Sequence, residues 1–484
     1  MKILYAGSEV LPFSSSGGLA DVMGSLPAAL KKRDPSSEVC VISPLYSSID
    51  RKYREKMKKT AEFNVRLSWR NQYCGIYSYE LDGVTYYFVD NEYYFKRGSL
   101  YGDFDDGERF AYFCAAIMEF MAQSGYYPDI LHANDWQTAL SVIYLKMRHG
   151  SEKGFRDVKA VFSIHNILFQ GQYDHAIAGD VFDLEPSWAP TVDQNGCINL
   201  MKGAVVCADN VVTVSPRYAE EIKTPEYGEG LDPIIRMYSC KLTGILNGID
   251  YTYYDPKTDD SIFRNYTFRS IDRKTDNKTA LQKELGLPVS AGTPMISVIS
   301  RLTDQKGLDL LTDRAEELLC DDVQLVILGC GDSRYEEYFR WLSRKYPDKV
   351  AALIKYDKLM SKRIYAASDI FLMPSRFEPC GLSQMIASRY GAVPVVRETG
   401  GLYDSIKPYR FVDGKQVGNG FTFAAPDSGD MLYVLRQALG LYRDRDSFRA
   451  LAVSIMKHDF SWHTSAALYA ELYDKILSER HVSQ

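Results

Sequence analysis

The sequence predicts an α/β protein made of two doubly wound parallel-sheet domains in tandem. The chain has 484 residues, which is too long for one hydrophobic core. Short, unalternated apolar runs rich in β-branched residues recur between amphipathic segments, as buried parallel strands do. A polar stretch, residues 250–278, divides these runs into two sets, and we place the domain boundary near residues 247–255.

The predicted strands follow one another along both halves of the chain. The last segment, from Asp459 onward, has the apolar spacing of a helix that crosses back onto the first domain. In doubly wound sheets, ligands bind beyond the carboxyl ends of the strands, so polar residues placed there are candidates for function. The strands are predicted at residues 3–6, 39–43, 130–132, 160–164 and 211–214 in the first half, and at 295–299, 324–328, 370–373 and 393–396 in the second.

Composition and charge exclude several classes of protein. A net charge of −6 and a pI near 5.8 give no general attraction to nucleic acid or to an acidic membrane. The nine cysteines are scattered without a C-x-x-C pair or a cluster with histidine, which argues against structural zinc and a disulfide framework. No stretch reads as a signal sequence or a membrane span, so we expect a cytoplasmic protein.

One hexapeptide pattern occurs in both halves, as SGGLAD at 16–21 and as TGGLYD at 399–404. A glycine pair lets the backbone approach a ligand closely. A helix that begins at the second glycine points its first N–H groups at that ligand and favours an anion. One such pair is more often an ordinary loop-to-helix turn. Two pairs in equivalent places favour a polyphosphate held between two lobes that face a cleft.

The second half places charged residues after two predicted strands. Glu378 follows the strand at 370–373, where a carboxylate is costly unless it is paired or functional. Gly381 and Leu382 then open a helix. Arg301 can chelate a phosphate and Lys306 adds a mobile point charge. An arginine–lysine pair is more often a solvated surface feature, but here both residues follow a strand's carboxyl end.

The first half has two polar clusters in equivalent positions. Asp135 and Trp136 follow the strand at 130–132, and they offer a hydrogen-bond acceptor and a flat ring. His165 and Asn166 follow the strand at 160–164. A lone histidine is usually a structural residue, and only the position and company of His165 favour a role in chemistry.

Taken together, these motifs resemble the family of bacterial glycogen synthases and plant starch synthases over nearly the whole chain. The resemblance implies a GT-B fold, with two Rossmann-like domains around a deep cleft. Residues 1–246 would form the acceptor-side domain, 247–459 the donor-side domain, and 460–484 the returning helix. The motifs are SGGLAD at 16–21, YGD at 101–103, NDW at 134–136, HN at 165–166, TVSP at 213–216, LNGID at 246–250, SRLTDQKG at 300–307, PSRFEPCGLSQ at 374–384 and TGGL at 399–402.

The resemblance also implies an activity and the residues that perform it. The family transfers glucose from ADP-glucose to the 4-hydroxyl at the non-reducing end of an α-1,4-glucan, with retention and with no cofactor. No Asp-x-Asp motif follows a strand, so we expect no metal. The implied catalytic residues are Glu378, His165, Arg301, Lys306 and Asp135. The implied donor-binding residues are Gly18, Asn247, Arg301, Lys306, Tyr356, Gly381, Leu382, Thr399, Gly400 and Gly401, and the implied sugar or acceptor pocket consists of Asp21, Asp135, Trp136 and Asn166.

The chain departs from the family pattern at a few positions. Ser15 stands where the family usually has a lysine that reaches the donor's diphosphate. Asn134 and Gln137 replace frequent histidines, and Ile386 stands where the wider clan often has a second glutamate. Two alternatives therefore stay open: a weakened paralogue that binds glucan or nucleotide without turnover, and a related transferase with another donor or acceptor. The choice between ADP-glucose and UDP-glucose also stays open, because Tyr356 can stack on either base.

Overall fold

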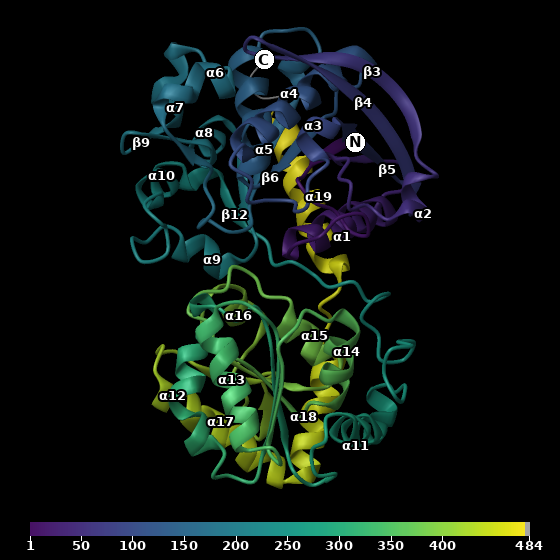
Figure 1. Ribbon diagram of the computed structural model, residues 1–484, viewed down its shortest axis with the longest axis vertical. Coiled ribbons are helices and arrows are strands. Elements are labelled where there is room, and N and C mark those ends of the chain that lie inside the picture. Colours follow the sequence, from purple (N-terminus) through teal and green to yellow (C-terminus); the bar gives the residue numbers. More distant parts are fainter. Residues whose placement is uncertain (480–484) are drawn as a thin grey trace. The chain divides into compact units, whose positions relative to one another are not determined.

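The structure, a computed structural model, describes residues 1–479. The chain divides into two compact units. Unit 1 comprises Met1–Gly248 together with the C-terminal segment that begins at Trp462, and unit 2 comprises Ile249–Ser461. In Figure 1, unit 1 runs from purple to teal and includes the yellow C-terminal helix α19. Each unit has its own sheet and its own hydrophobic core.

Unit 1 is built on a nine-stranded sheet with the order β12-β11-β7-β6-β1-β2-β5-β4-β3. The seven strands from β12 to β5 are parallel, and their order reverses at β1 and β6, as in a doubly wound sheet. All five strands predicted for this half are present. The strands are β1 (Lys2–Ala6), β2 (Glu38–Pro44), β3 (Lys58–Leu67), β4 (Arg70–Leu81), β5 (Val84–Asp90), β6 (Ile130–Asn134), β7 (Lys159–Ile164), β11 (Asn210–Thr213) and β12 (Leu242–Gly244).

Strand β4 is antiparallel to its neighbours β3 and β5, so the sheet is mixed at this end, where the sequence analysis had predicted no strand. The sequence analysis missed β3 and β4 because their residues are mostly exposed or half-buried, unlike the continuous apolar runs of buried strands. A small separate sheet also joins β8 (Gln172–Tyr173), β10 (Cys197–Asn199) and β9 (Asp193–Gln194).

The helices of unit 1 cover the parallel sheet, and the last of them comes from the C-terminal end of the described chain. Helix α19 packs on α1, and the Tyr473 hydroxyl lies 2.6 Å from both the Tyr5 hydroxyl and His132 Nδ1. The helices are α1 (Gly18–Arg33), α2 (Arg51–Arg54), α3 (Glu92–Phe95), α4 (Asp106–Ser124), α5 (Trp136–Ile143), α6 (Ala178–Phe182), α7 (Ala189–Val192), α8 (Leu200–Cys207), α9 (Pro216–Glu221), α10 (Asp232–Met237) and α19 (Trp462–Ser478).

Unit 2 has a six-stranded, all-parallel sheet with the order β15-β14-β13-β16-β17-β20. Taken along the chain this is the order 3-2-1-4-5-6 of a Rossmann sheet, which reverses between β13 and β16. All four strands predicted for this half are present. The strands are β13 (Met295–Ile299), β14 (Gln324–Leu328), β15 (Val350–Leu353), β16 (Ile370–Met373), β17 (Val393–Arg397) and β20 (Phe421–Phe423).

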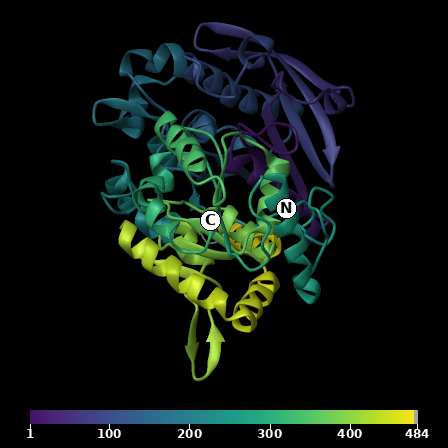
Figure 2. The same cartoon turned by 60° about the horizontal axis from the view of Figure 1, so that its bottom comes forward.

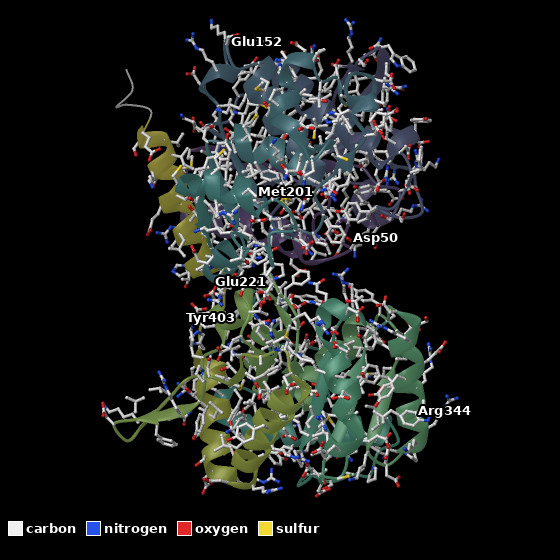
Figure 3. The ribbon with its side chains drawn as sticks, turned by 90° about the vertical axis from the view of Figure 1, so that its left-hand side faces the viewer. Asp50, Glu152, Met201, Glu221, Arg344 and Tyr403 are labelled. Carbon is white, nitrogen blue, oxygen red and sulfur yellow. The ribbon has the colours of Figure 1, made fainter. Side chains whose placement is uncertain are left out.

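Helices lie on both faces of this sheet, with one apolar cluster on each face. A two-stranded hairpin, β18 (Arg410–Val412) and β19 (Lys415–Val417), projects from the unit (Figure 2; Figure 3). In residues 1–479, no helix combines the length and the apolar character that crossing a membrane requires. The helices are α11 (Lys274–Glu284), α12 (Leu308–Leu318), α13 (Ser333–Lys345), α14 (Lys358–Ala367), α15 (Ser383–Arg389), α16 (Gly400–Ser405), α17 (Ser428–Arg443) and α18 (Arg445–Lys457).

Candidate functional site

The reversal point of the unit 2 sheet brings together the charged residues that follow β13 and β16. Lys306 Nζ lies 2.6 Å from Glu378 Oε2, and the Ser375 hydroxyl donates to the same oxygen at 3.1 Å. Glu378 is only 7% exposed, so the ammonium of Lys306 compensates a buried charge. Arg301 is exposed and forms no ion pair with any residue in 1–479, so its guanidinium is available to an anion.

Backbone contacts lock the loops that carry these two side chains. Gly307 has φ +62°, and a Cβ there would lie 2.0 Å from the Pro374 carbonyl oxygen. The Arg376 amide donates to the Gln305 carbonyl at 2.9 Å. Buried Arg397, at the end of β17, donates from its guanidinium to the Ser375 and Arg376 carbonyls. The sequence analysis missed Arg397, although its position at a strand's carboxyl end was a usable signal.

The second glycine pair, Gly400 and Gly401, is packed against the loop of Glu378. Cβ atoms at these positions would lie 2.0 Å from the carbonyl oxygens of Glu378 and Cys380, respectively. The Gly401 amide also donates to the Glu378 carbonyl at 3.0 Å. Helix α16 begins at Gly400, the first glycine of this pair. The chain itself therefore requires glycine at both positions, whether or not a ligand binds nearby.

The first glycine pair lies in open space. Helix α1 begins at Gly18, as predicted, and no atom lies within 4 Å of a Cβ built there. The neighbouring Ser16 amide donates to the carboxylate of Glu9, which also accepts from the Gly17 amide. Burial raises the pKa of Glu9 to about 7, although these amide donors oppose the shift. The Glu9 carboxylate thus accepts from the two amides that precede the helix start at Gly18.

Glu9 is a site residue that the sequence analysis missed. It is 3% exposed and stands directly after the apolar run of β1. The same signal, a carboxylate after a buried strand, had pointed to Glu378.

Asp135 has an unusual backbone at the reversal point of the unit 1 sheet. Its φ of 58° and ψ of 178° lie in a region that is nearly confined to glycine, at a cost of roughly 1–3 kcal/mol. Its Oδ1 accepts the His165 amide at 2.8 Å, and the Asn166 amide also donates to it. Burial raises the pKa of Asp135 to about 7, and the nearby charge of Glu9 adds to the shift. Such strain is characteristic of functional positions.

The hydrogen bonds around His165 fix its tautomer. The Asn134 amide nitrogen donates to the Ala6 and His132 carbonyls at 3.0 and 3.2 Å, so Asn134 Oδ1 must face His165 Nε2, 2.9 Å away. Since that oxygen only accepts, His165 carries its proton on Nε2 and a lone pair on Nδ1. Burial lowers the pKa of His165 to about 4, so the ring is neutral at pH 7.

His132 is a buried structural residue, as a lone histidine usually is. Its ring is 1% exposed, and Nε2 lies 2.6 Å from the Ser163 hydroxyl. Burial lowers its pKa to about 3, with a smaller contribution from His165.

The other residues predicted for the sugar or acceptor pocket lie in three different local settings of unit 1. The Trp136 indole packs against Phe110 and Tyr173, with centroids 5.5 and 6.0 Å away, and the backbone of Gly171 covers part of its ring. Asn166 caps its own loop by accepting the Leu168 amide at 3.1 Å. Asp21 lies in the first turn of α1.

Two of the predicted donor-binding residues stand out, Asn247 in unit 1 and Tyr356 in unit 2. Asn247 is 6% exposed, and its Oδ1 has no hydrogen-bond partner within residues 1–479. Tyr356 is 76% exposed, so its ring is open to a ligand. Gly381 has φ +70° and lies directly before Leu382, the N-cap of α15.

Across the described residues 1–479, no group of three or more His, Cys, Asp or Glu side chains is arranged to hold a metal ion.

Comparisons with known proteins agree with this geometry. Residues 2–237 match the starch synthase catalytic domain, and residues 284–451 match the glycosyl transferases group 1. A glycogen synthase of Clostridium perfringens is 47% identical over 479 residues, covering 99% of this chain and 98% of the relative. A glycogen synthase of Geobacillus stearothermophilus is 45% identical over 482 residues, with coverages of 99% and 98%.

Solved glycosyltransferase structures have the same fold as this chain. The catalytic domain of starch synthase IV from Arabidopsis thaliana, bound to ADP and acarbose, matches with a TM-score of 0.90 and 34% identity, covering 98% of this chain and 99% of that chain. A sucrose-phosphate synthase from Thermosynechococcus elongatus shares the fold at a TM-score of 0.60 and 15% identity, covering 99% of each chain. The chain thus has the two-domain α/β glycosyltransferase fold of the GT-B type.

Proposed function

Because the chain belongs to the glycogen synthase family, we propose that it transfers glucose from ADP-glucose to the 4-hydroxyl at the non-reducing end of an α-1,4-glucan, with retention of configuration. The observation that supports this most directly is the pairing of Lys306 with buried Glu378, in the segment after β13 that also carries Arg301. Two cations and one carboxylate at the reversal point of a Rossmann sheet suit a sugar diphosphate.

On the donor side, Arg301 and Lys306 would neutralise the diphosphate, whose negative charge grows as the bond to the anomeric carbon breaks. Cations held in place before the reaction stabilise that charge without reorganisation. Glu378 would bind hydroxyls of the donor glucose, because a carboxylate offers two acceptor oxygens and only Oε2 is held by Lys306 and Ser375. Tyr356 would stack on the base and Asn247 would bind the sugar.

Backbone groups would contribute unequally to donor binding. The first amides of α15, after Gly381 and Leu382, have no intrahelical acceptor and are suited to phosphate. At Thr399, Gly400 and Gly401 the pair of glycines already meets the 378–380 loop. Nothing lies within 4 Å of a Cβ built at Gly18, so a ligand can approach the backbone more closely there than at Gly400 and Gly401.

On the acceptor side, Asp135 and His165 would line the sugar pocket with Asp21, Trp136 and Asn166. A neutral His165 does not act as a cation toward the oxocarbenium-like sugar, so it acts as a hydrogen-bonding group. We propose that attack and departure take place on the same face of the sugar, which gives retention without a covalent intermediate. Ile386 stands where the wider clan often has a second glutamate, so Glu378 lacks that partner here.

Ser15 is expected to weaken donor binding, because no lysine or arginine lies close by in sequence to replace the family's lysine. A hydrogen bond to a charged group contributes about 1.5–3 kcal/mol, so Ser15→Lys should tighten ADP-glucose binding by about 10- to 150-fold. Isothermal titration of ADP-glucose with both proteins measures this. Equal affinities would mean that another group already does the work of the lysine.

A donor and acceptor screen tests the function itself. We expect ADP release with chain extension when purified protein meets ADP-glucose and glycogen, and loss of both in Arg301→Ala. Binding of ADP and glucan without any release would favour the weakened paralogue, for which Ser15 is the supporting observation. Turnover only with another donor or a monosaccharide acceptor would favour a different transferase.

A further inference from the structure

The tip of the β3–β4 hairpin carries an exposed tryptophan whose orientation is fixed. Trp69 is 73% exposed, although tryptophan is usually largely buried. Its indole Nε1 donates to Asp180 Oδ1 of α6 at 2.5 Å, and the Arg70 guanidinium lies 4.5 Å from the ring centroid. One face of the ring thus rests on Arg70 while the rest of the residue remains in water.

The support beneath the ring is itself immobilised. Arg70, with a side chain 10% exposed, pairs with Glu108 of α4 at 2.9 Å and with Asp180 at 3.2 Å. It also donates to the Asp180 carbonyl at 2.5 Å. Three elements, the hairpin, α4 and α6, therefore hold one side chain that buries little apolar area. Because so little apolar area is buried, holding Trp69 in this orientation contributes little to the stability of the fold.

We propose that Trp69, supported by Arg70 and Asp180, forms an accessory binding site for the α-glucan acceptor. This proposal rests on the proposed function, because it takes the acceptor to be a glucan polymer. A rigid, half-open aromatic face suits the C–H face of a sugar ring, and the Asp180 carboxylate beside it can accept sugar hydroxyls. We call this set of residues the hairpin-tip site.

Charge and size favour a neutral sugar over other ligands. The Arg70 guanidinium pairs with the carboxylates of both Glu108 and Asp180, at 2.9 and 3.2 Å. The site therefore has no surplus positive charge for a phosphate or a nucleic acid. A single ring surrounded by charges is also far smaller than the several hundred Å² of apolar surface that mark a protein interface.

The hairpin tip lies on the same side of the unit 1 sheet as the predicted acceptor residues. Strand β3 runs parallel to β1, since β4 is antiparallel to both β3 and β5 while β5 and β2 are parallel to β1. Its carboxyl end, which leads into Trp69, therefore points toward the edge where β6 ends at Asp135. A polymer bound at this edge can reach beyond the pocket that holds its terminal sugar.

Packed aromatic side chains also join the two places. The Trp136 ring contacts Tyr173 at 6.0 Å, and Tyr173 contacts Phe182 at 5.0 Å between centroids. Phe182 and Asp180 belong to the same short helix, α6. The hairpin-tip site is thus tied to the predicted acceptor pocket through side chains rather than through a loop alone.

The test compares Trp69→Ala with wild type in affinity electrophoresis on glycogen and in steady-state kinetics. We expect glycogen binding to weaken on the order of 5- to 10-fold, with a matching rise of KM for glycogen. The values of kcat and of KM for ADP-glucose and maltotriose should not change. The matched control is Tyr433→Ala, which removes a 65% exposed ring from α17 of unit 2 and should change nothing.

Two further variants separate the ring from its orientation. Trp69→Phe keeps a ring without the N–H donor, and Asp180→Ala keeps the indole but removes its anchor, so both should give intermediate losses. Unchanged glycogen binding in Trp69→Ala would overturn the proposal, as would a variant whose only change is a shift of oligomeric state in sedimentation. If wild type fails to extend glycogen at all, the proposed function fails, whereas wild-type extension with an unaffected Trp69→Ala refutes only the accessory site.

Discussion

At the scale of single residues, three buried carboxyl groups differ in the partners that surround them. Glu378 is buried but has Lys306 at 2.6 Å, whereas Glu9 and Asp135 have only amide and hydroxyl donors. Amide donors offset desolvation in part, and the pKa of Glu9 and of Asp135 stays raised to about 7. Unit 1 thus places two weakly acidic carboxyls where unit 2 places an ion pair.

The raised pKa of Glu9 predicts a pH-dependent stability. Between pH 4.5, its ordinary pKa, and pH 7, the unfolded chain has lost a proton that the folded chain keeps. The free energy of unfolding therefore falls as pH rises through this window and levels off above it. Glu9→Gln, which keeps an acceptor for the Ser16 amide, should remove this loss, a difference of up to about 3 kcal/mol.

Urea unfolding of wild type and Glu9→Gln at pH 5 and pH 8 measures that difference. The exposed Glu55, changed to Gln, serves as the control and should leave the pH dependence as it is in wild type. Parallel pH dependences for wild type and Glu9→Gln would contradict a raised pKa at Glu9.

His165 gives a second prediction at this scale. Long-range ¹H–¹⁵N spectra should show a neutral ring with its proton on Nε2 from pH 6 to pH 8, because burial lowers the pKa to about 4 and Asn134 accepts from Nε2. Asn134→Ala should allow the two tautomers to exchange. Titration of wild-type His165 near pH 6.5 would show that the ring is more solvated than the structure indicates.

At the scale of elements, continuous apolar runs were the informative signal. The nine strands predicted from them are all present, because strands buried on both faces contain little except apolar residues. Strands β3 and β4 were missed, since most of their residues are exposed or half-buried and form no long apolar run. The short edge strands β12, β15 and β20 also carry too few buried residues to stand out.

Residues of the candidate site could be predicted from the sequence only where the residue type itself, such as a charged side chain after a buried strand, indicated a function. Arg301, Lys306 and Glu378 were found because charges after buried strands are conspicuous, and the structure gathers Lys306 and Glu378. Asn134 was noted only as a departure, yet it sets the tautomer of His165. Such a role depends on which carbonyls lie nearby, and those come from β1 and from the backbone of β6 itself.

Helix packing in unit 2 depends on one buried lysine. The Lys274 ammonium of α11 donates to the carbonyls of Tyr365 and Ala366 at 2.9 Å and of Tyr390 at 3.0 Å, at the ends of α14 and α15. Lys274→Met keeps the length but leaves these carbonyls without the donor. It should lower the free energy of unfolding by about 2–4 kcal/mol in urea titrations.

The control for this change lies on the same helix. Lys283→Met removes an exposed ammonium from α11 and should change the free energy of unfolding by less than about 0.5 kcal/mol. If both variants unfold like wild type, the ends of α14 and α15 do not need the lysine.

At the scale of the whole molecule, each unit has its own core, so thermal unfolding should show two transitions. Tyr473→Phe removes a hydroxyl that contacts Tyr5 and His132 inside unit 1. Buried polar groups left without a partner cost about 1–3 kcal/mol. Calorimetry should therefore show the unit 1 transition lowered by a few degrees, with the unit 2 transition unchanged.

Tyr433→Phe is the matched control, because that exposed tyrosine of unit 2 should affect neither transition. A single transition that moves as a whole in Tyr473→Phe would show that the two units unfold together.

The return of α19 to unit 1 affects the order in which the chain is completed during synthesis. Residues 1–248 leave the ribosome first, but the helix that supplies Tyr473 is made only after all of unit 2. At roughly 5–20 residues per second, the wait lasts on the order of ten seconds or more. At the end of that time the nascent chain carries a complete second unit and an incomplete first one, in which His132 and Tyr5 still lack the Tyr473 hydroxyl. Nascent unit 1 is therefore the part of the chain most in need of a chaperone.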